Sequence, residues 1–233
     1  MRVRIKFSKH GVVKFIGHLD IMRYFQKAIR RSEIDIAYSS GFSPHQIMSF
    51  AAPLGVGYCS NGEYLDIEVN SHQGSEQMLT ALNGVMVEGI KILSVVALPD
   101  SVGNAMASVA AAGYTIEWKK GYVPLPNMQK TAEAFLNRDT IPVIKQTKKN
   151  ELSLDLKPGI YDFKVTDNSL YLLVDASSSG NVKPTLLLEA LYRFAGQEFN
   201  PLSVQITREE TYTAVAEDET RRLVPLDAVG VTF

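Results

Sequence analysis

The order of hydrophobic patterns along the first hundred residues restricts the fold more than any other feature. Residues 3–11 alternate apolar and basic side chains with a period of two, which is typical of a half-buried strand. Residues 18–34 then place apolar side chains three and four positions apart, which predicts an amphipathic helix. The remaining patterns predict strands at 46–58 and 62–69, a helix at 75–86 and a strand at 89–98. This order predicts a ferredoxin-like βαββαβ domain over residues 1–100.

The same order recurs after a stretch of small residues. Residues 101–107 predict a linker, because they are weakly patterned and contain glycine. The later segments are strands at 111–120, 141–147, 151–168, 169–176 and 202–213, and helices at 127–138 and 183–196. We therefore expect an α+β protein of two tandem ferredoxin-like domains with antiparallel sheets. The second domain covers residues 108–233 and ends in an extended C-terminal arm.

Composition indicates a globular, cytoplasmic protein. The chain has 233 residues, is 45% hydrophobic and carries a formal net charge of -1. We expect no membrane association, because no apolar run approaches the roughly 20 residues that span a bilayer. The basic N-terminus is followed by no apolar run long enough for a signal peptide.

The near-neutral total hides a strong asymmetry of charge. Residues 1–31 hold nine lysines and arginines against one acid, Asp20, whereas residues 32–100 hold eight acids and one cation, Lys91. Clustering of this kind indicates an anionic partner, although it says nothing about the fold.

Part of this basic cluster falls on one stripe of the first predicted helix. Its members are Arg23, Lys27, Arg30 and the adjacent Arg31. Such cations would hold nucleic-acid phosphates, while the aromatic ring of Tyr38 or Phe42 stacks on a base. The alternative is an ordinary solvated helix face, and the sequence leaves both interpretations open.

The stretch between the first helix and the next strand combines residues suited to a rigid loop. Gly41 permits a positive φ, and Pro44 fixes its own φ and restrains the residue before it. A loop stiffened in this way would hold the imidazole of His45 in one direction, as a general acid or base requires. In the alternative interpretation, His45 merely satisfies a backbone carbonyl in a tight turn.

The sequence lacks the patterns of a metal centre or a nucleotide cofactor, so we expect neither. The histidines are His10, His18, His45 and His72, and no pair has the i, i+4 spacing of a zinc-binding helix. Cys59 is the only cysteine, which excludes a thiolate cluster and an intrachain disulfide, and we expect it to be a small buried side chain. No G-x-G-x-x-G or G-x-x-x-x-G-K-[ST] motif is present.

Residues 15–69 carry a series of motifs that resembles the radical-SAM-linked domain family. The motifs are F-x-x-H-L-D-x-x-R, a helix ending in paired basic residues, Y-S-x-G-F-x-P-H, P-L-x-x-G and E-Y-x-D. Gln46 stands where that family usually has proline, and Gly17 where serine is common. The matching residues are Phe15, His18, Leu19, Asp20, Arg23, Tyr38, Ser39, Gly41, Phe42, Pro44, His45, Pro53, Leu54, Gly57, Glu63, Tyr64 and Asp66.

The resemblance implies association with a radical-SAM protein and sometimes with a ribonuclease E/G-like protein. This chain cannot itself be the radical enzyme, because a cluster-binding C-x-x-x-C-x-x-C motif needs three thiolates. We expect an accessory protein that binds tRNA or precursor RNA. Its expected RNA-binding residues are Arg23, Lys27, Arg30, Arg31, Tyr38, Ser39, Phe42 and His45. Asp20, Glu63, Tyr64 and Asp66 are expected to support them, the last three by bracing His18 and His45.

Two alternatives from other functional classes remain open. In a metal-independent endoribonuclease, His45 would be the general base or acid, with His18 and a serine hydroxyl assisting and a cation steadying the phosphorane. In a protein-docking module, the same motifs would contact a radical-SAM partner without any nucleic acid. Whether the chain is an enzyme is undecided by the sequence, which favours the non-catalytic role.

Overall fold

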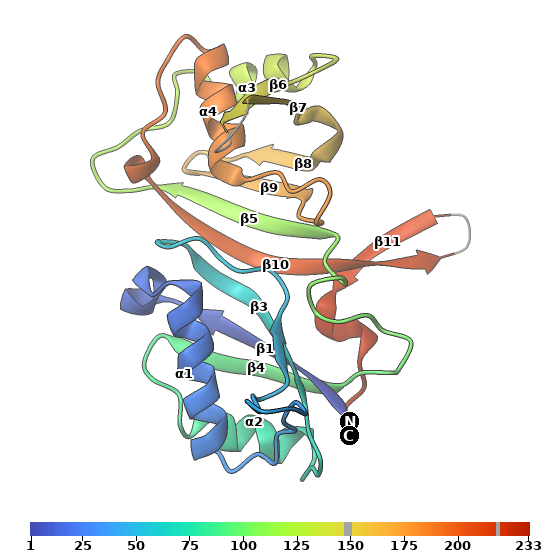
Figure 1. Cartoon of the computed structure of the whole chain (residues 1–233). Helices are drawn as coiled ribbons and strands as arrows, with labels where there is room; N and C mark the ends of the chain where they lie inside the picture. Colours follow the sequence, from blue (N-terminus) through green and yellow to red (C-terminus); the bar gives the residue numbers. More distant parts are fainter. Residues whose placement is uncertain (147–150, 218–219) are drawn as a thin grey trace. The chain divides into compact units, whose positions relative to one another are not determined.

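The computed structural model describes residues 1–146, 151–217 and 220–233 (Figure 1). The chain divides into two compact units, one of Met1–Ala111 with Arg208–Phe233 and one of Ala112–Thr207. Residue 147 of one predicted strand and residues 218–219 of the predicted arm lie outside the described residues. Both units combine helices with antiparallel strand pairs, which confirms the mixed α and β architecture.

The first unit is built on strands from both ends of the chain. The order of neighbouring strands is β4-β1-β3-β10, and β1 pairs antiparallel with both β3 and β4. The short β2 pairs with β3, and β11 pairs with β10. The strands are β1 (Arg2–Lys9), β2 (Met48–Phe50), β3 (Cys59–Glu68), β4 (Ile90–Ala97), β10 (Val204–Glu217) and β11 (Thr220–Pro225). The helices are α1 (His18–Arg31) and α2 (Ser75–Asn83), with 3-10 turns η1 (Gly11–Phe15) and η4 (Leu226–Val229).

One face of these strands forms the core of the first unit against α1 and α2. Val3, Ile5 and Phe7 alternate along β1 and are fully buried, as the period-two pattern predicts. The ring of Phe7 lies 4.6 Å from that of Phe25 on α1. In Figure 1 both helices lie on the same side of β1, β3 and β4. Burial of this apolar stripe fixes the position of α1.

The opposite face of β1 differs from the expectation of a half-solvated strand. Arg4 is fully buried, and its guanidinium donates to the carbonyl of Leu226 in η4 at 2.9 Å. The C-terminal segment therefore covers the basic face of β1 instead of leaving it to water. This contact also corrects the predicted boundary, because residues 208–233 belong to the first unit and not to a domain of residues 108–233.

Gly62 on β3 shows how closely β10 approaches. A Cβ atom at this position would lie 2.7 Å from the Cα of Glu210, which is closer than Cβ contacts allow. Only glycine leaves room for the neighbouring backbone here.

The strand predicted at 46–58 is much shorter in the structure, where only Met48–Phe50 forms β2. Pro53 follows shortly after and has no amide hydrogen for the strand ladder. Gly57 adopts a φ of 89°, which ends the extended conformation before β3.

The second unit consists of two helices and a further set of strands. β5 neighbours β9, which pairs antiparallel with β8, while β6 and β7 form a separate antiparallel pair. The predicted strand at 151–168 is divided into β7 and β8 by a 3-10 turn at Lys157–Gly159, where Pro158 interrupts pairing. The elements are β5 (Ala111–Trp118), α3 (Met128–Leu136), β6 (Pro142–Gln146), β7 (Glu151–Asp155), β8 (Ile160–Val165), β9 (Ser169–Asp175) and α4 (Pro184–Phe194). Among the described residues, no helix has both the length and the apolar character needed to cross a membrane.

Candidate nucleic-acid interface

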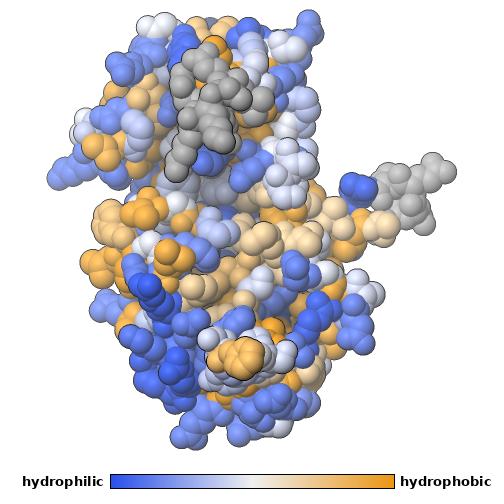
Figure 2. Space-filling view, in the orientation of Figure 1, coloured by the Kyte–Doolittle hydropathy of each residue, from blue (hydrophilic) through white to orange (hydrophobic). Residues whose placement is uncertain are grey.

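Helix α1 presents its cations to solvent because its other face is committed to the core. Ile21, Phe25, Ala28 and Ile29 are buried, at the three- and four-residue steps of one helix face. The cations of the stripe occupy the remaining turns and are exposed: Arg23, Lys27, Arg30 and Arg31. Figure 2 shows hydrophilic residues over the area where Figure 1 draws α1. The predicted stripe is therefore a surface feature.

The four cations differ in how firmly they are held. Arg23 lies 3.3 Å from the carboxylate of Asp20, one turn earlier, and both side chains are about two-thirds exposed. Arg31 donates to the carbonyl of Val85 at 3.2 Å and lies over the ring of Tyr24. In the part of the chain that the structure describes, no ion pair or hydrogen bond engages the ammonium of Lys27 or the guanidinium of Arg30. The middle of the stripe is thus open to an anionic ligand.

The loop of residues 38–46 is closed by hydrogen bonds between its two ends. The amide of Ser39 donates to the carbonyl of His45 at 2.8 Å, and the amide of His45 donates to the Ser39 hydroxyl at 3.1 Å. The Ser39 hydroxyl also lies 2.8 Å from Nδ1 of the His45 imidazole. These contacts hold the exposed His45 through its amide and Nδ1, and leave Nε2 out of this hydrogen bonding. Gly41, at a φ of 109°, makes the turn that permits them.

Aromatic side chains project from the same loop. Phe42 is fully exposed, and Tyr38 is half-exposed beside the bridge it forms with Gln46. An exposed phenylalanine gains nothing from burial within the unit, which makes it available to stack on a partner.

Gln46 attaches this loop to α1. Its side chain is buried, and Nε2 donates to the carbonyl of Gln26 at 3.3 Å, one residue before Lys27. The C-terminal end of the loop is therefore attached to the backbone of α1, at the residue before Lys27. Gln46 is also a position at which the motif series of residues 15–69 differs from the one it resembles, which has proline there, and the Gln46 amide makes this contact.

His18 packs against the end of β2. It is half-buried, and its ring meets Phe50 edge-on at a centroid distance of 5.2 Å. His10 Nε2 lies 2.8 Å from Asn61 Oδ1, and His72 packs against Phe233. Among the residues that the structure describes, no three histidine, cysteine or acidic side chains form a group that would hold a metal ion.

The three residues of the E-Y-x-D motif do not brace the histidines. Asp66 accepts two hydrogen bonds from Arg4, at 2.7 and 2.8 Å, and both side chains are buried. Glu63 forms an ion pair with Arg208, which also donates to the carbonyl of Ala52. The expected support of His18 and His45 is therefore wrong, because these acids face buried arginines.

Tyr64 lies at the centre of the same buried polar region. Its hydroxyl lies 2.7 Å from Glu210 and 3.0 Å from Asp227, and Asp227 also accepts from Ser94. Burial, reinforced by the two carboxylates, raises the pKa of Tyr64 far above its usual range.

Lys6 and Lys9 extend this region along β1. Lys6 forms an ion pair with Glu210 at 2.5 Å. Lys9 is buried near Glu63, and burial lowers the pKa of its ammonium although the carboxylate of Glu63 opposes the shift. Sequence analysis missed this arrangement, although basic residues alternating on β1 and acids on β3 were a signal that the two strands pair by charge.

Cys59 is buried, as expected for a small apolar side chain.

Comparison with known proteins assigns the chain to a family. A family model described as "Uncharacterized protein conserved in bacteria (DUF2344)" matches residues 2–184. The chain belongs to this family. A comparison with curated proteins found no match.

A solved structure described as "Crystal Structure of a Cbf5-Nop10-Gar1 Complex" is similar to the chain at 8% identity and a TM-score of 0.47. The similarity covers 90% of this chain and 48% of the other, so the chain spans about half the length of that protein.

Proposed function

We propose that this DUF2344 protein binds RNA, either tRNA or a precursor RNA, through α1 and the loop of residues 38–46. The observation that carries the proposal is the contact between Gln46 and the Gln26 carbonyl, which attaches the loop with the exposed aromatic rings to the helix with the exposed cations. Cations bind the phosphates of RNA, and aromatic rings stack on its unpaired bases. Helix α1 supplies the cations, and the attached loop supplies the rings.

We further propose that the protein acts as an accessory to a radical-SAM protein, in some settings with a ribonuclease E/G-like protein. Support for these partners comes from the sequence motifs of residues 15–69. As part of the same proposal, each unit derives from a ferredoxin-like βαββαβ domain. The supporting observation is the strand order β4-β1-β3 with β2 on β3 in the first unit.

The cations would supply most of the affinity. On a single strand, each neutralised phosphate contributes about -0.7 to the slope of log affinity against log salt. Contacts from Arg23, Lys27 and Arg30, with or without Arg31, predict a slope of about -2 to -3. Stacking of a base on Phe42 or Tyr38 would add about 1–3 kcal/mol that salt does not screen.

The test is a titration of labelled total tRNA and a single-stranded RNA with the protein at several salt concentrations. The double variant Arg23→Gln/Lys27→Gln should reduce the magnitude of the slope by about 1.4, because two phosphate contacts are lost. Phe42→Ala should weaken binding by about tenfold or more and leave the slope unchanged.

Lys120→Gln/Lys130→Gln is the matched control, because it removes two exposed cations from the second unit. It should bind RNA as the unaltered protein does. Equal slopes for the Arg23/Lys27 variant and the unaltered protein would refute the assignment of α1.

A second candidate is a metal-independent endoribonuclease, favoured by the hydrogen bond between Ser39 and Nδ1 of His45. This contact orients the imidazole so that Nε2 faces a substrate, as acid or base catalysis requires. His18, whose ring meets Phe50 edge-on, would assist His45. His45→Ala should then bind RNA without cleaving it. The candidate fails if the unaltered protein cleaves no RNA.

A third candidate is a docking module for a protein partner, favoured by exposed apolar side chains around the start of α1. Val12, Phe15, Leu19 and Val56 are each 60% exposed or more. Binding of a radical-SAM partner that does not weaken with salt, and that Phe15→Ser/Leu19→Ser abolishes, would support docking. Unaltered partner binding by that variant would exclude this surface.

A further inference from the structure

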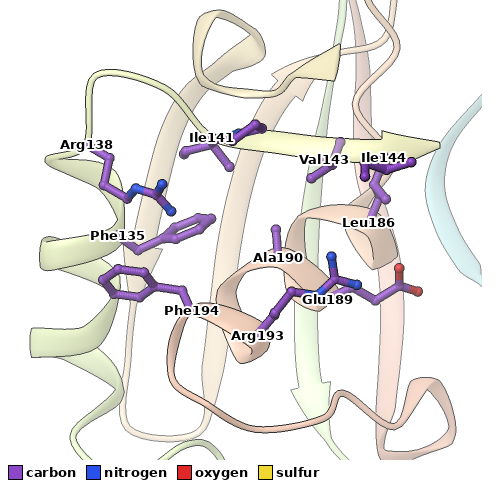
Figure 3. A pocket seen from close by; sticks show the side chains of 11 residues that line it. Phe135, Arg138, Ile141, Val143, Ile144, Leu186, Glu189, Ala190, Arg193 and Phe194 are labelled. Atoms are coloured by element: carbon purple, nitrogen blue, oxygen red, sulfur yellow. The ribbon is translucent and has the colours of Figure 1, made fainter. Parts of the chain in front are cut away.

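The second unit contains a surface cavity of about 260 Å³ between α3, α4 and β6 (Figure 3). All the described residues that line it belong to Ala112–Thr207. The cavity therefore shares no residue with the α1 interface, and the inference drawn from it does not rest on the proposed function.

The floor of the cavity is apolar. Phe135 and Val143 are buried, and Phe194, which is partly exposed, lies with its ring centroid 5.6 Å from that of Phe135. Ala190 faces the cavity from α4, and its small side chain leaves the space that a larger residue would fill (Figure 3). These surfaces suit an aromatic ring or a short hydrocarbon.

Two arginines complete the cavity. Arg138 comes from the segment after α3 and Arg193 from α4, and Figure 3 draws their guanidinium groups on different sides of the cavity, that of Arg193 beside Glu189. Arg138 lies over the ring of Phe194 at 5.7 Å, which holds its plane. Across the described residues, neither guanidinium forms an ion pair or a hydrogen bond. Their donors remain available to a ligand.

The charge and the volume of the cavity together indicate the class of ligand. Among the described residues, the lining carries two arginines and one acid, Glu189, which gives this part of the lining a net positive charge. Guanidinium groups match the paired oxygens of carboxylates and phosphates. The volume lies below the roughly 300–1,000 Å³ of pockets for drug-sized molecules, so one ring with one anionic group fills it.

We propose that this cavity binds a small organic anion, whose phosphate or carboxylate pairs with the guanidinium of Arg138 or of Arg193 while the apolar floor receives a single ring or short chain. Neither part of the ligand is sufficient alone. An anionic group without a ring or chain makes no contact with the apolar floor. A ring or chain without an anionic group leaves the arginines unpaired.

The experiment is calorimetric titration of the full chain with phenyl phosphate and benzoate, with inorganic phosphate and phenol as the separate halves of the ligand. At least one of the two complete probes should bind tenfold or more tightly than either half. A preference for phenyl phosphate identifies the natural ligand as an organic phosphate, and a preference for benzoate as a carboxylic acid.

Variants locate the binding. At least one of Arg138→Gln and Arg193→Gln should weaken binding of the preferred probe by about tenfold, the equivalent of one charge-assisted hydrogen bond. Ala190→Leu should abolish binding by filling the floor without changing the charge. Lys120→Gln/Lys130→Gln should have no effect.

The inference is overturned if neither complete probe binds more tightly than its halves. It is equally overturned if both arginine variants bind the probe as the unaltered protein does. Circular dichroism on each variant keeps loss of fold distinct from loss of binding.

Discussion

The first unit contains two arginine–aspartate pairs that use the same chemistry in opposite surroundings. Arg4 and Asp66 meet through two hydrogen bonds of 2.7 and 2.8 Å, with side chains 0% and 9% exposed. Arg23 and Asp20 meet through one contact of 3.3 Å, with side chains 68% and 67% exposed. The first pair is a fixed part of the interior, and the second is a loose surface contact.

The difference shows that counting charges overstates what a partner meets. Three of the cations that make the N-terminus basic are paired within the first unit. Arg4 pairs with Asp66, Lys6 pairs with Glu210, and Lys9 lies near Glu63. What remains for an anionic ligand is chiefly the stripe on α1. A solvated cation can attract an anionic partner, whereas a buried, paired cation affects the stability of the fold.

The sharpest way to break the comparison is to remove the acid from each pair. Asp66→Asn should lower the free energy of unfolding by about 3–5 kcal/mol, because it leaves the guanidinium of Arg4 buried without a counter-charge. Asp20→Asn should cost only about 0.3–1 kcal/mol, mostly through the dipole of α1. Urea denaturation measures both values, and equal costs would show that the two pairs do not differ in burial.

A smaller effect is expected at Tyr64, which shares the buried region. Tyr64→Phe should lower the free energy of unfolding by about 1–3 kcal/mol, because Glu210 and Asp227 lose a hydrogen-bond donor. The exposed Tyr122 gives the control, and Tyr122→Phe should change stability by less than about 0.5 kcal/mol.

The same variant has a defined pH dependence. Because burial raises the pKa of Tyr64, the folded protein keeps this proton at a pH where the unfolded chain releases it. The contribution of Tyr64 is therefore complete below about pH 10 and is lost as the pH rises further. The stability difference between the unaltered protein and Tyr64→Phe should shrink above about pH 10, and a constant difference would contradict the raised pKa.

The smallest effect is expected at the surface cation itself. Arg23→Gln should change the free energy of unfolding by less than about 0.5 kcal/mol, because the residue is solvated and its pair is weak. A loss of several kcal/mol would place Arg23 among the structural cations and remove it from the proposed interface.

Much of the candidate interface follows from local pattern. The apolar steps through Ile21, Phe25 and Ile29 predict both α1 and the exposure of Arg23, Lys27 and Arg30 on its other face. The turn around Gly41 likewise follows from its residue types. These features were predictable because helix periodicity and turn chemistry act over a few residues.

The surroundings of the E-Y-x-D motif did not follow from local pattern. Glu63, Tyr64 and Asp66 are close in sequence to the loop with His45, and that closeness suggested a shared site. Their partners are instead Arg208, Glu210, Asp227 and Arg4. The nearest of the C-terminal partners is 145 positions away along the chain.

The sequence by itself determined the order and kind of most elements, the family motifs and the cationic face of α1. Only the tertiary structure decided that the cations of β1 are paired inside the first unit, and that residues 208–233 join that unit. The physical reason is that burial of a charge depends on what packs over it. For Arg4 that cover includes the carbonyl of Leu226, 222 residues further along the chain.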